Sequence, residues 1–189
     1  TPTQFNANWS AVTGAASYLL DVSTDNFLSF VSGYNAKSVT GATSVVTGLS
    51  AGTTYQYRLR AVNASGNSGY SNVTNVLMRP AAPVVSAATS VTINSTTASW
   101  TASPTATGYF IDVSSDNFSS FVASFNNKSL GNVLTANITG LTPFTNYSVR
   151  VRSANASGSS DNSNVIVVKT LQSEPASQPT SIQFSNVTN

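Results

Sequence analysis

The stretch Trp9–Phe27, WSAVTGAASYLLDVSTDNF, returns later in the chain as Trp100–Phe118, WTASPTATGYFIDVSSDNF. Equivalent residues of the two copies, such as Trp9 and Trp100, lie 91 positions apart. A fixed period of this length is typical of a tandem array of one structural unit. The 189 residues of the chain therefore predict two such units, and the pattern inside each copy indicates what kind of unit it is.

Apolar and polar residues alternate in short runs within each copy. In Tyr18–Ser23, YLLDVS, the residues Tyr18, Leu20 and Val22 fall on one side and Leu19, Asp21 and Ser23 on the other. Strict alternation over such runs predicts half-buried β-strands, and the Gly-, Ser- and Asn-rich stretches between them predict turns. The expected strands are Thr3–Ser10, Tyr18–Ser23, Phe30–Tyr34, Ser44–Val46, Thr54–Asn63 and Val73–Met78 in the first copy, and Val84–Ile93, Thr97–Thr101, Phe144–Ala154 and Val165–Thr170 in the second. Many short strands without a helical period predict an all-β fold of two tandem β-sandwiches.

Three segments follow from this alignment. Residues 1–79 (unit one) form a repeat that lacks its first strand, residues 80–170 (unit two) form a complete repeat, and residues 171–189 form a linker with a further strand. Within that last segment, Ser181–Phe184 lines up with Ser90–Ile93 of unit two. It either opens a third repeat or is donated to unit one of a neighbouring chain, since an uncovered sheet edge recruits another strand.

The linker between the units is short and is bracketed by Pro80 and Pro83. A linker of this length and composition restricts rotation of the two units. We therefore expect an extended rod with a small contact between the units.

One set of residues recurs in both units and points to a known family. A Trp lies in the second strand, a Tyr opens the third, and the long strand reads L-x5-Y-x-Y-R-L-R-A-x-N-x-x-G. The chain resembles tandem fibronectin type III repeats. The matching residues are Trp9, Tyr18, Leu49, Tyr55, Leu59, Ala61, Asn63 and Gly66, and then Trp100, Tyr109, Leu141, Tyr147, Val151, Ala154, Asn155 and Gly158. The resemblance implies an immunoglobulin-like sandwich, with the tyrosine corner of that fold at Tyr55 and Tyr147.

A narrower likeness rests on the stretch Asp21–Val31, DVSTDNFLSFV. It resembles repeats of large secreted or cell-surface proteins of Bacteroidota. This resemblance implies a module of an extracellular protein and no particular chemistry, because fold and function are separable.

The composition argues against several classes of function. Charged residues make up 7% of the chain, far below the roughly 25% of ordinary soluble domains. No run of basic residues gives a nucleic-acid footprint, and no apolar run has the length of a membrane span. Neither His nor Cys is present, so the usual general base and thiol nucleophile are missing. We therefore predict no enzyme, no catalytic residues and no cofactor.

The acidic residues suggest a metal site at first sight. Asp21, Ser23 and Asp25 alternate like calcium ligands, and Asp112, Ser114 and Asp116 repeat the spacing. A dedicated calcium loop would also carry a Gly and a bidentate Glu, which are missing here. The favoured interpretation is a polar strand end followed by an Asp-Asn turn, so no metal site is predicted.

The regularly placed charges predict ion pairs instead. Asp21 is expected to point outward, opposite Arg58 and Arg60 of the neighbouring antiparallel strand. The same arrangement recurs in unit two, where Asp112 lies opposite Arg150 and Arg152. We predict one cross-strand ion pair in each unit, which would contribute about 0.2–1 kcal/mol to stability.

The aromatic residues fall into two groups. Those that repeat are expected in the cores: Trp9 and Trp100, Tyr18 and Tyr109, Phe27 and Phe118, Phe30 and Phe121, Tyr34 and Phe125. Tyr70, Phe110 and Phe144 have no aromatic counterpart in the other unit. They would form either contacts between units or a surface that stacks on sugars.

Two functions fit the sequence. The first is a non-catalytic repetitive extracellular stalk or adhesin segment, which contacts itself or adjacent repeats head-to-tail and assembles into a filament. The second is a carbohydrate-binding or spacer module of a secreted polysaccharide-degrading enzyme. Both place the chain outside the cell or on a bacterial cell surface, with surface glycans or proteins as further partners.

Overall fold

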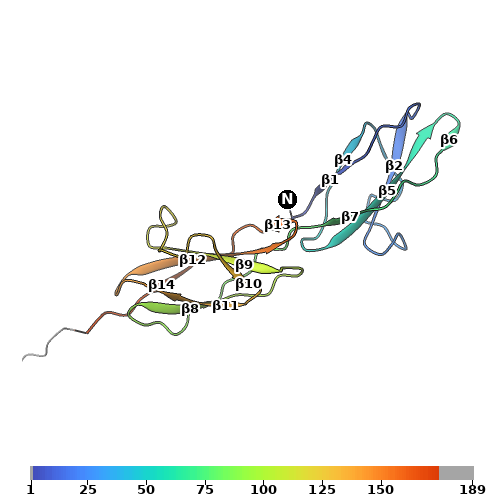
Figure 1. Ribbon diagram of the computed structural model, residues 1–189. Helices are drawn as coiled ribbons and strands as arrows, with labels where there is room; N and C mark the ends of the chain where they lie inside the picture. Colours follow the sequence, from blue (N-terminus) through green and yellow to red (C-terminus); the bar gives the residue numbers. More distant parts are fainter. Residues whose placement is uncertain (1, 175–189) are drawn as a thin grey trace, which may run out of the picture.

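The computed structural model describes residues 2–174, and Figure 1 shows two β-sandwiches arranged end to end. The strands of unit one are β1 (Phe5–Asn8), β2 (Ser17–Ser23), β3 (Lys37–Val39), β4 (Thr43–Val46), β5 (Thr54–Asn63), β6 (Gly66–Asn67) and β7 (Thr74–Leu77). Those of unit two are β8 (Ser95–Ser99), β9 (Gly108–Ser114), β10 (Lys128–Gly131), β11 (Thr135–Thr139), β12 (Asn146–Asn155), β13 (Gly158–Ser159) and β14 (Ile166–Lys169). The extended arrangement is the one expected from the short linker.

The two units share one topology. In unit one, β1 pairs with β4, and the second sheet has the order β3-β2-β5-β6 with β7 also pairing with β5. In unit two, β8 pairs with β11, and the second sheet has the order β10-β9-β12-β13 with β14 pairing with β12. All of these pairs are antiparallel. No helix long and apolar enough to cross a membrane occurs among residues 2–174.

Each unit has its own core between its two sheets. The inward residues of the long strand, Tyr55, Tyr57 and Leu59 in β5, are buried, as the alternation predicts. Tyr55 is a tyrosine corner: its hydroxyl accepts a hydrogen bond from the Ser50 N–H at 2.9 Å. Tyr147 makes the same bond with the Thr142 N–H at 2.9 Å, so the resemblance placed both residues correctly.

Two of the predicted strands are wrong or incomplete. Phe30–Tyr34 is not a strand; it forms a turn whose polar groups bind the edge of β2, because the Val31 N–H bonds to the Val22 carbonyl and the Val22 N–H to the Tyr34 carbonyl. The strand at this edge is β3, which the sequence did not predict. Val84–Ile93 is not a regular strand: it forms only isolated bridges with unit two, at Val85 and Thr89, and Ser90 has a left-handed φ of 49°.

The predicted cores also need correction. Tyr34 and Phe125 are buried as expected. However, Phe27, Phe30, Phe118 and Phe121 are only partly buried and belong to neither core cluster. They form surface pairs, with ring centroids 6.4 Å apart in each unit. The guanidinium of Arg58 lies 4.0 Å from the ring centroid of Phe27, and that of Arg150 lies 4.0 Å from the ring centroid of Phe118.

The two tryptophans differ in burial. Trp100 is 4% exposed beneath the opening segment, which bridges to it at Val85. Trp9 is only half-buried, and in the described part of the chain no segment lies against β1 on the side away from β4. Unit one therefore presents an uncovered sheet edge. The predicted strand Ser181–Phe184 lies outside the described residues.

Candidate interaction surfaces

The regularly placed charges form buried cross-strand ion pairs. Asp21 accepts a hydrogen bond from Arg58 Nε at 3.2 Å, and Asp112 accepts bonds from Arg150 Nε at 2.9 Å and Arg152 Nη2 at 3.1 Å. The predicted pairs are confirmed, and the aspartates lie on the outward face of the sheet as expected, but that face is covered at both positions. Asp21 and Asp112 are each 2% exposed, since the arginine side chains and the loop after the strand cover them.

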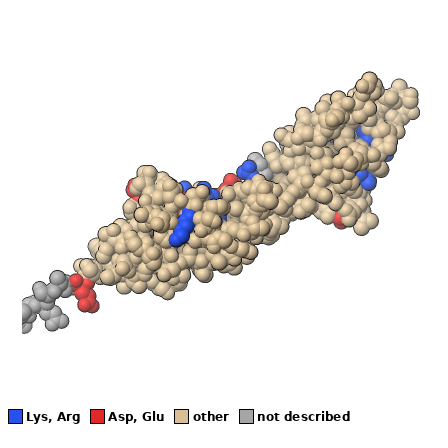
Figure 2. Space-filling model, in the orientation of Figure 1, with Lys and Arg blue, Asp and Glu red and all other residues tan. Residues whose placement is uncertain are grey.

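That loop supplies a further ligand to each buried carboxylate. The Ala36 N–H donates to Asp21 Oδ1 at 2.8 Å, and the Asn127 N–H donates to Asp112 Oδ1 at 2.6 Å. The aspartates therefore tie the loop to the sheet, which is a structural role. The face of the molecule shown in Figure 2 carries few charged side chains, since almost every atom there belongs to a residue that is neither acidic nor basic.

Arg60 does not join the ion pair of unit one. Its guanidinium lies 4.7 Å from the ring centroid of Tyr70, while Arg58 lies 3.7 Å from the same ring and 4.0 Å from the ring of Phe27. In unit two the counterpart Arg152 donates to the Asn127 side chain at 2.7 Å. Ala36 stands in place of Asn127 and offers no such acceptor, so Arg60 turns toward Tyr70.

The suggested metal ligands are engaged elsewhere. Asp25 accepts hydrogen bonds from the Ser29 hydroxyl at 2.6 Å and the Ser29 N–H at 2.9 Å, and from the Ser23 hydroxyl at 2.7 Å. These bonds, chiefly those from Ser29, lower the pKa of Asp25 to about 2. Asp116 has the same partners in Ser120 and Ser114, and its pKa is also lowered to about 2. Each aspartate thus closes the predicted Asp-Asn turn, and the described residues contain no cluster of acidic groups that could hold a metal ion.

The unpaired aromatics do not make one surface. Tyr70 belongs to unit one and lies against two arginines. Phe144 is 58% exposed, and the Lys169 ammonium lies 3.4 Å from its ring centroid. Phe110 is partly buried on β9. Among the described residues no aromatic pair joins any of these three rings.

The joint between the units is made by hydrogen bonds to the backbone at the end of unit one and in the linker. Asn155 Nδ2 donates to the Met78 carbonyl at 2.9 Å, the Ser157 hydroxyl donates to the Leu77 carbonyl, and the Ser153 hydroxyl donates to the Ala81 carbonyl at 2.6 Å. These donors sit on the β12–β13 hairpin of unit two. Unit two therefore binds the closing end of unit one directly, in addition to the covalent connection through the linker.

A glycine makes the closest approach at this joint. A Cβ atom on Gly52 would lie 2.6 Å from the carbonyl oxygen of Pro104. On the other side of the joint, a Cβ atom on Gly158 would lie 3.2 Å from the Arg79 side chain. The two units are thus close-packed at points where any larger side chain would push them apart.

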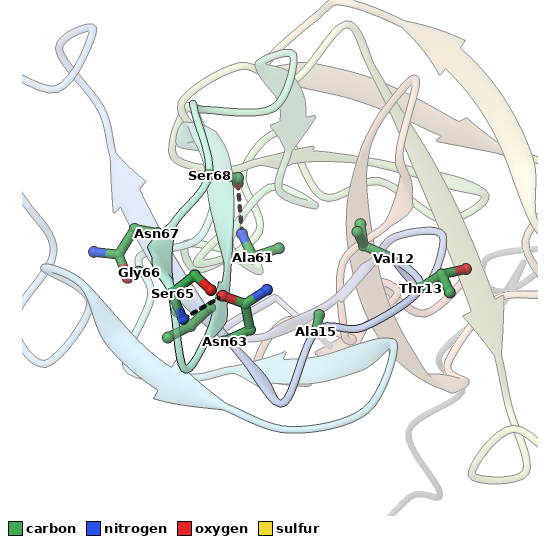
Figure 3. Close-up of a pocket in the computed structure, with 10 residues that line it drawn as sticks. Val12, Thr13, Ala15, Ala61, Asn63, Ser65, Gly66, Asn67 and Ser68 are labelled. Carbon is green, nitrogen blue, oxygen red and sulfur yellow. Dashed lines mark hydrogen bonds between the residues drawn. The ribbon is translucent and has the colours of Figure 1, made fainter.

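The equivalent surface of unit one is open. A hollow of about 260 Å³, here called the socket, is lined by Val12, Thr13, Ala15, Ala61, Val62, Asn63, Ser65, Gly66, Asn67 and Ser68 (Figure 3). With the 92-position shift that applies to the long strand and its hairpin, Asn63 corresponds to Asn155 and Ser65 to Ser157. The socket is therefore the counterpart in unit one of the surface with which unit two holds the joint.

A second hollow follows the uncovered edge of β1. This groove has a volume of about 380 Å³ and is lined by Asn8, Trp9, Ser10, Val12, Tyr57, Leu59, Ser71, Asn72 and Thr74. In unit two the counterpart of Asn72 is Asn164, whose side chain accepts from the Val85 N–H at 2.8 Å and donates to the Val85 carbonyl at 2.9 Å. The groove thus has the shape and the amide group that hold an extended segment in unit two.

Comparison with known proteins agrees with this architecture. The fibronectin type III domain family matches residues 1–77 and again residues 81–169. The chain belongs to the fibronectin type III family. A two-domain fibronectin type III segment of chicken tenascin shares the fold with a TM-score of 0.52 at 20% identity, covering 90% of this chain and 94% of that one. The FN1–FN3 domains of chicken CNTN1 have a TM-score of 0.43 at 17% identity, with 90% of this chain and 63% of that one covered.

Chitinase A1 of Niallia circulans is a relative of this chain. It is 35% identical over 190 residues, which cover 87% of this chain and 25% of the relative. The chain thus spans about a quarter of that protein's length. Fibronectin type III repeats are generally non-catalytic modules, which agrees with the prediction made from the missing His and Cys.

The sequence predicted the ion-pair residues and missed the two hollows. The signal for both lay in the alignment of the units. Asn63 and Asn155, and likewise Asn72 and Asn164, are paired positions, but their roles become visible only once unit two shows what each asparagine holds.

Proposed function

We propose that the chain is a non-catalytic spacer segment of an extracellular stalk or adhesin built from fibronectin type III repeats. The observation that carries this proposal is the joint. Asn155, Ser157 and Ser153 of unit two fix the backbone that leaves unit one, so the two repeats project in a defined direction. A spacer needs this property, because it must keep whatever it carries at a distance from its anchor.

Small-angle X-ray scattering tests the proposal. The chain should have the maximum dimension and cross-section of two sandwiches end to end, and the profile should be fitted by a single conformation. Asn155→Ala with Ser157→Ala should broaden the distribution of shapes. The matched control is Asn63→Ala with Ser65→Ala, which changes the corresponding residues away from the joint. A compact pair, or a joint equally flexible in all three proteins, would contradict the spacer function.

A second candidate function is a carbohydrate-binding or spacer module of a secreted polysaccharide-degrading enzyme. The 35% identity to chitinase A1 favours it, and the exposed rings of Tyr70 and Phe144 are the groups that would stack on sugars. Binding to insoluble chitin, and loss of that binding in Tyr70→Ala or Phe144→Ala, would support a binding module. If the chain does not bind chitin or other insoluble glycans, the binding module is excluded and only the spacer function remains.

The spacer proposal includes assembly of copies head-to-tail. The uncovered edge of unit one would take the tail of a neighbouring copy, in which residues 181–184 repeat the pattern of Ser90–Ile93. Because the donated segment and the groove are different surfaces, the contact would propagate as an open filament. The tail would not return to its own unit one, since residues 171–179 reach at most about 30 Å at roughly 3.3 Å per residue, and residues 171–174 leave unit two at the end away from unit one (Figure 1).

Sedimentation velocity tests this assembly. The unmodified chain should show a sedimentation coefficient that rises with concentration, and Ile182→Ser with Phe184→Ser should abolish the rise. Asn72→Ala should weaken it, because Asn72 corresponds to Asn164, which holds the opening segment of unit two at Val85. A chain that stays monomeric at high concentration would rule out donation by the tail and would leave the spacer function intact.

A further inference from the structure

We propose that the socket of unit one docks the closing end of another fibronectin type III repeat joined ahead of it, and that this repeat carries glycine at the position of Gly52. The inference rests on the proposed spacer function and names the partner of one surface. It starts from the joint that the chain already contains, in which the counterpart of the socket is occupied.

The hydrogen-bonding groups of the socket are already oriented. Asn63 Oδ1 accepts from the Ser65 N–H at 2.9 Å, and Asn155 Oδ1 accepts from the Ser157 N–H at 2.8 Å. This bond fixes the amide plane in both units. In unit one it directs Asn63 Nδ2 away from the hairpin (Figure 3). In unit two Asn155 Nδ2 holds Met78, whereas Asn63 Nδ2 makes no hydrogen bond among the described residues. The Ser65 hydroxyl likewise makes no hydrogen bond among the described residues.

Burial differs at the same positions. Ser103 is 8% exposed at the joint, and its counterpart Val12 is 51% exposed. Ser160 is buried, while its counterpart Ser68 is exposed. Arg79 lies over Gly158, and nothing lies within 4 Å of a Cβ atom placed on Gly66. An apolar side chain, two unused donors and an open glycine therefore occupy a surface that a repeat covers in unit two.

The closing end of unit two is the wrong shape for this socket. Phe144 takes the position of Gly52: its N–H donates to the Leu171 carbonyl at 3.0 Å, as the Gly52 N–H donates to the Arg79 carbonyl at 2.8 Å. At the joint even a Cβ atom at this position meets a backbone oxygen at 2.6 Å, so a phenylalanine ring is excluded. The socket thus distinguishes between repeats, and a second copy of this chain does not dock there through unit two.

The partner must be tethered. The joint rests on a few hydrogen bonds and two close-packed glycines, which is too small a contact for stable association of separate molecules. A short covalent linker raises the effective concentration to about the millimolar range. The stretch Arg79–Ile93 shows the kind of linker required, because its Ala81 carbonyl binds the hairpin and its opening segment bridges to unit two at Val85 and Thr89.

A three-repeat chain tests the inference directly. In this chain, residues 1–93 are followed by residues 3–189. Thr3 then follows Ile93 as Asn94 does in the natural order, because Thr3 and Asn94 are equivalent positions 91 residues apart. The probe is hydrogen exchange of the Asn side-chain amide, measured by NMR. We expect the Asn63 amide of the second repeat to exchange at least about tenfold more slowly than in the 189-residue chain. The Asn155 amide serves as the protected reference in both proteins.

Gly52→Phe in the first repeat alone is the matched variant. It should remove the protection of Asn63 in the second repeat and leave that of Asn155 unchanged. The inference is overturned if the three-repeat chain gives no protection, or if Gly52→Phe leaves the protection intact. Protection of Asn63 that appears in the 189-residue chain as its concentration rises would also overturn it, since docking would then need no tether. A flexible Asn155 joint would reject the spacer function instead, so the two failures are distinguishable.

Discussion

Arg152 donates a hydrogen bond to Asp112 across 3.1 Å, whereas its counterpart Arg60 makes no such contact with Asp21. Arg60 Nε is instead buried without a hydrogen-bond partner among the described residues. The difference follows from two substitutions between the units. Asn127 accepts from Arg152 where unit one has Ala36, and Tyr70 attracts Arg60 where unit two has Asn162.

Ala36→Asn should stabilise unit one. Ala36 has a φ of 54° and Asn127 a φ of 49°, and asparagine tolerates this left-handed region better than alanine. The new amide would also offer Arg60 the acceptor that Arg152 already has. We expect a gain of about 0.5–1 kcal/mol in the free energy of unfolding. Urea unfolding followed by Trp9 fluorescence in a Trp100→Phe background measures it.

The control for this variant is Ala64→Asn, at an exposed turn position outside the left-handed region. It should change the unfolding midpoint by less than the Ala36 variant. A midpoint that falls in Ala36→Asn would show that the loop of unit one cannot adopt the network of unit two.

Asp112→Asn should cost more than Asp21→Asn. Each aspartate is buried, but Asp112 is bound by two arginines and Asp21 by one. The arginines keep about a fifth to a quarter of their side chains exposed, so the loss should lie between that of an exposed pair and that of a fully buried one. We expect about 2–3 kcal/mol for Asp112→Asn and about 1–2 kcal/mol for Asp21→Asn. Unit-specific unfolding monitored by NMR would give both values, and equal losses would argue against the role of the second arginine.

Asp25 should titrate far below its ordinary range. The Ser29 hydroxyl and N–H, with the Ser23 hydroxyl, lower its pKa from 3.8 to about 2. Because the folded-state pKa is depressed, the contribution of this turn is fully present above about pH 4 and is lost as the pH falls toward 2. NMR titration of the carboxyl carbon should give a midpoint near 2, and Ser29→Ala should raise it. A midpoint that Ser29→Ala leaves unchanged would assign the shift to another cause.

Alternation and repetition were enough to predict the sandwich, the long strands and the partners of the aspartates. Thr54–Asn63 was placed to the residue, because a strand with one buried face carries a period of two in its sequence. Phe30–Tyr34 was misplaced for the opposite reason. Its apolar residues follow no strand geometry, and its backbone groups bind β2 through a turn that ends in the left-handed residue Ala36.

The burial of Asp21 was also beyond the sequence pattern. Alternation places it on the outer face of the sheet, and it does lie there, but the face is covered by Arg58 and by the loop bonded at Ala36. Coverage of an outer face depends on long-range packing of loops, which leaves no period in the sequence. The socket was hidden in the same way, since its meaning depends on how a neighbouring repeat sits.

Gly52→Ala should loosen the joint between the units, and Gly48→Ala should not. Both glycines have a positive φ, 65° for Gly52 and 75° for Gly48, so each alanine should cost unit one a similar amount, about 1–2 kcal/mol. Only at Gly52 would the new Cβ atom also meet the Pro104 carbonyl at 2.6 Å, whereas nothing lies within 4 Å at Gly48. Small-angle scattering should therefore show a broader range of shapes for Gly52→Ala alone, and the Asn155 side-chain amide should exchange faster in that variant. If the two variants behave alike in both measurements, the orientation of the units is set by the linker and not by contact at Gly52.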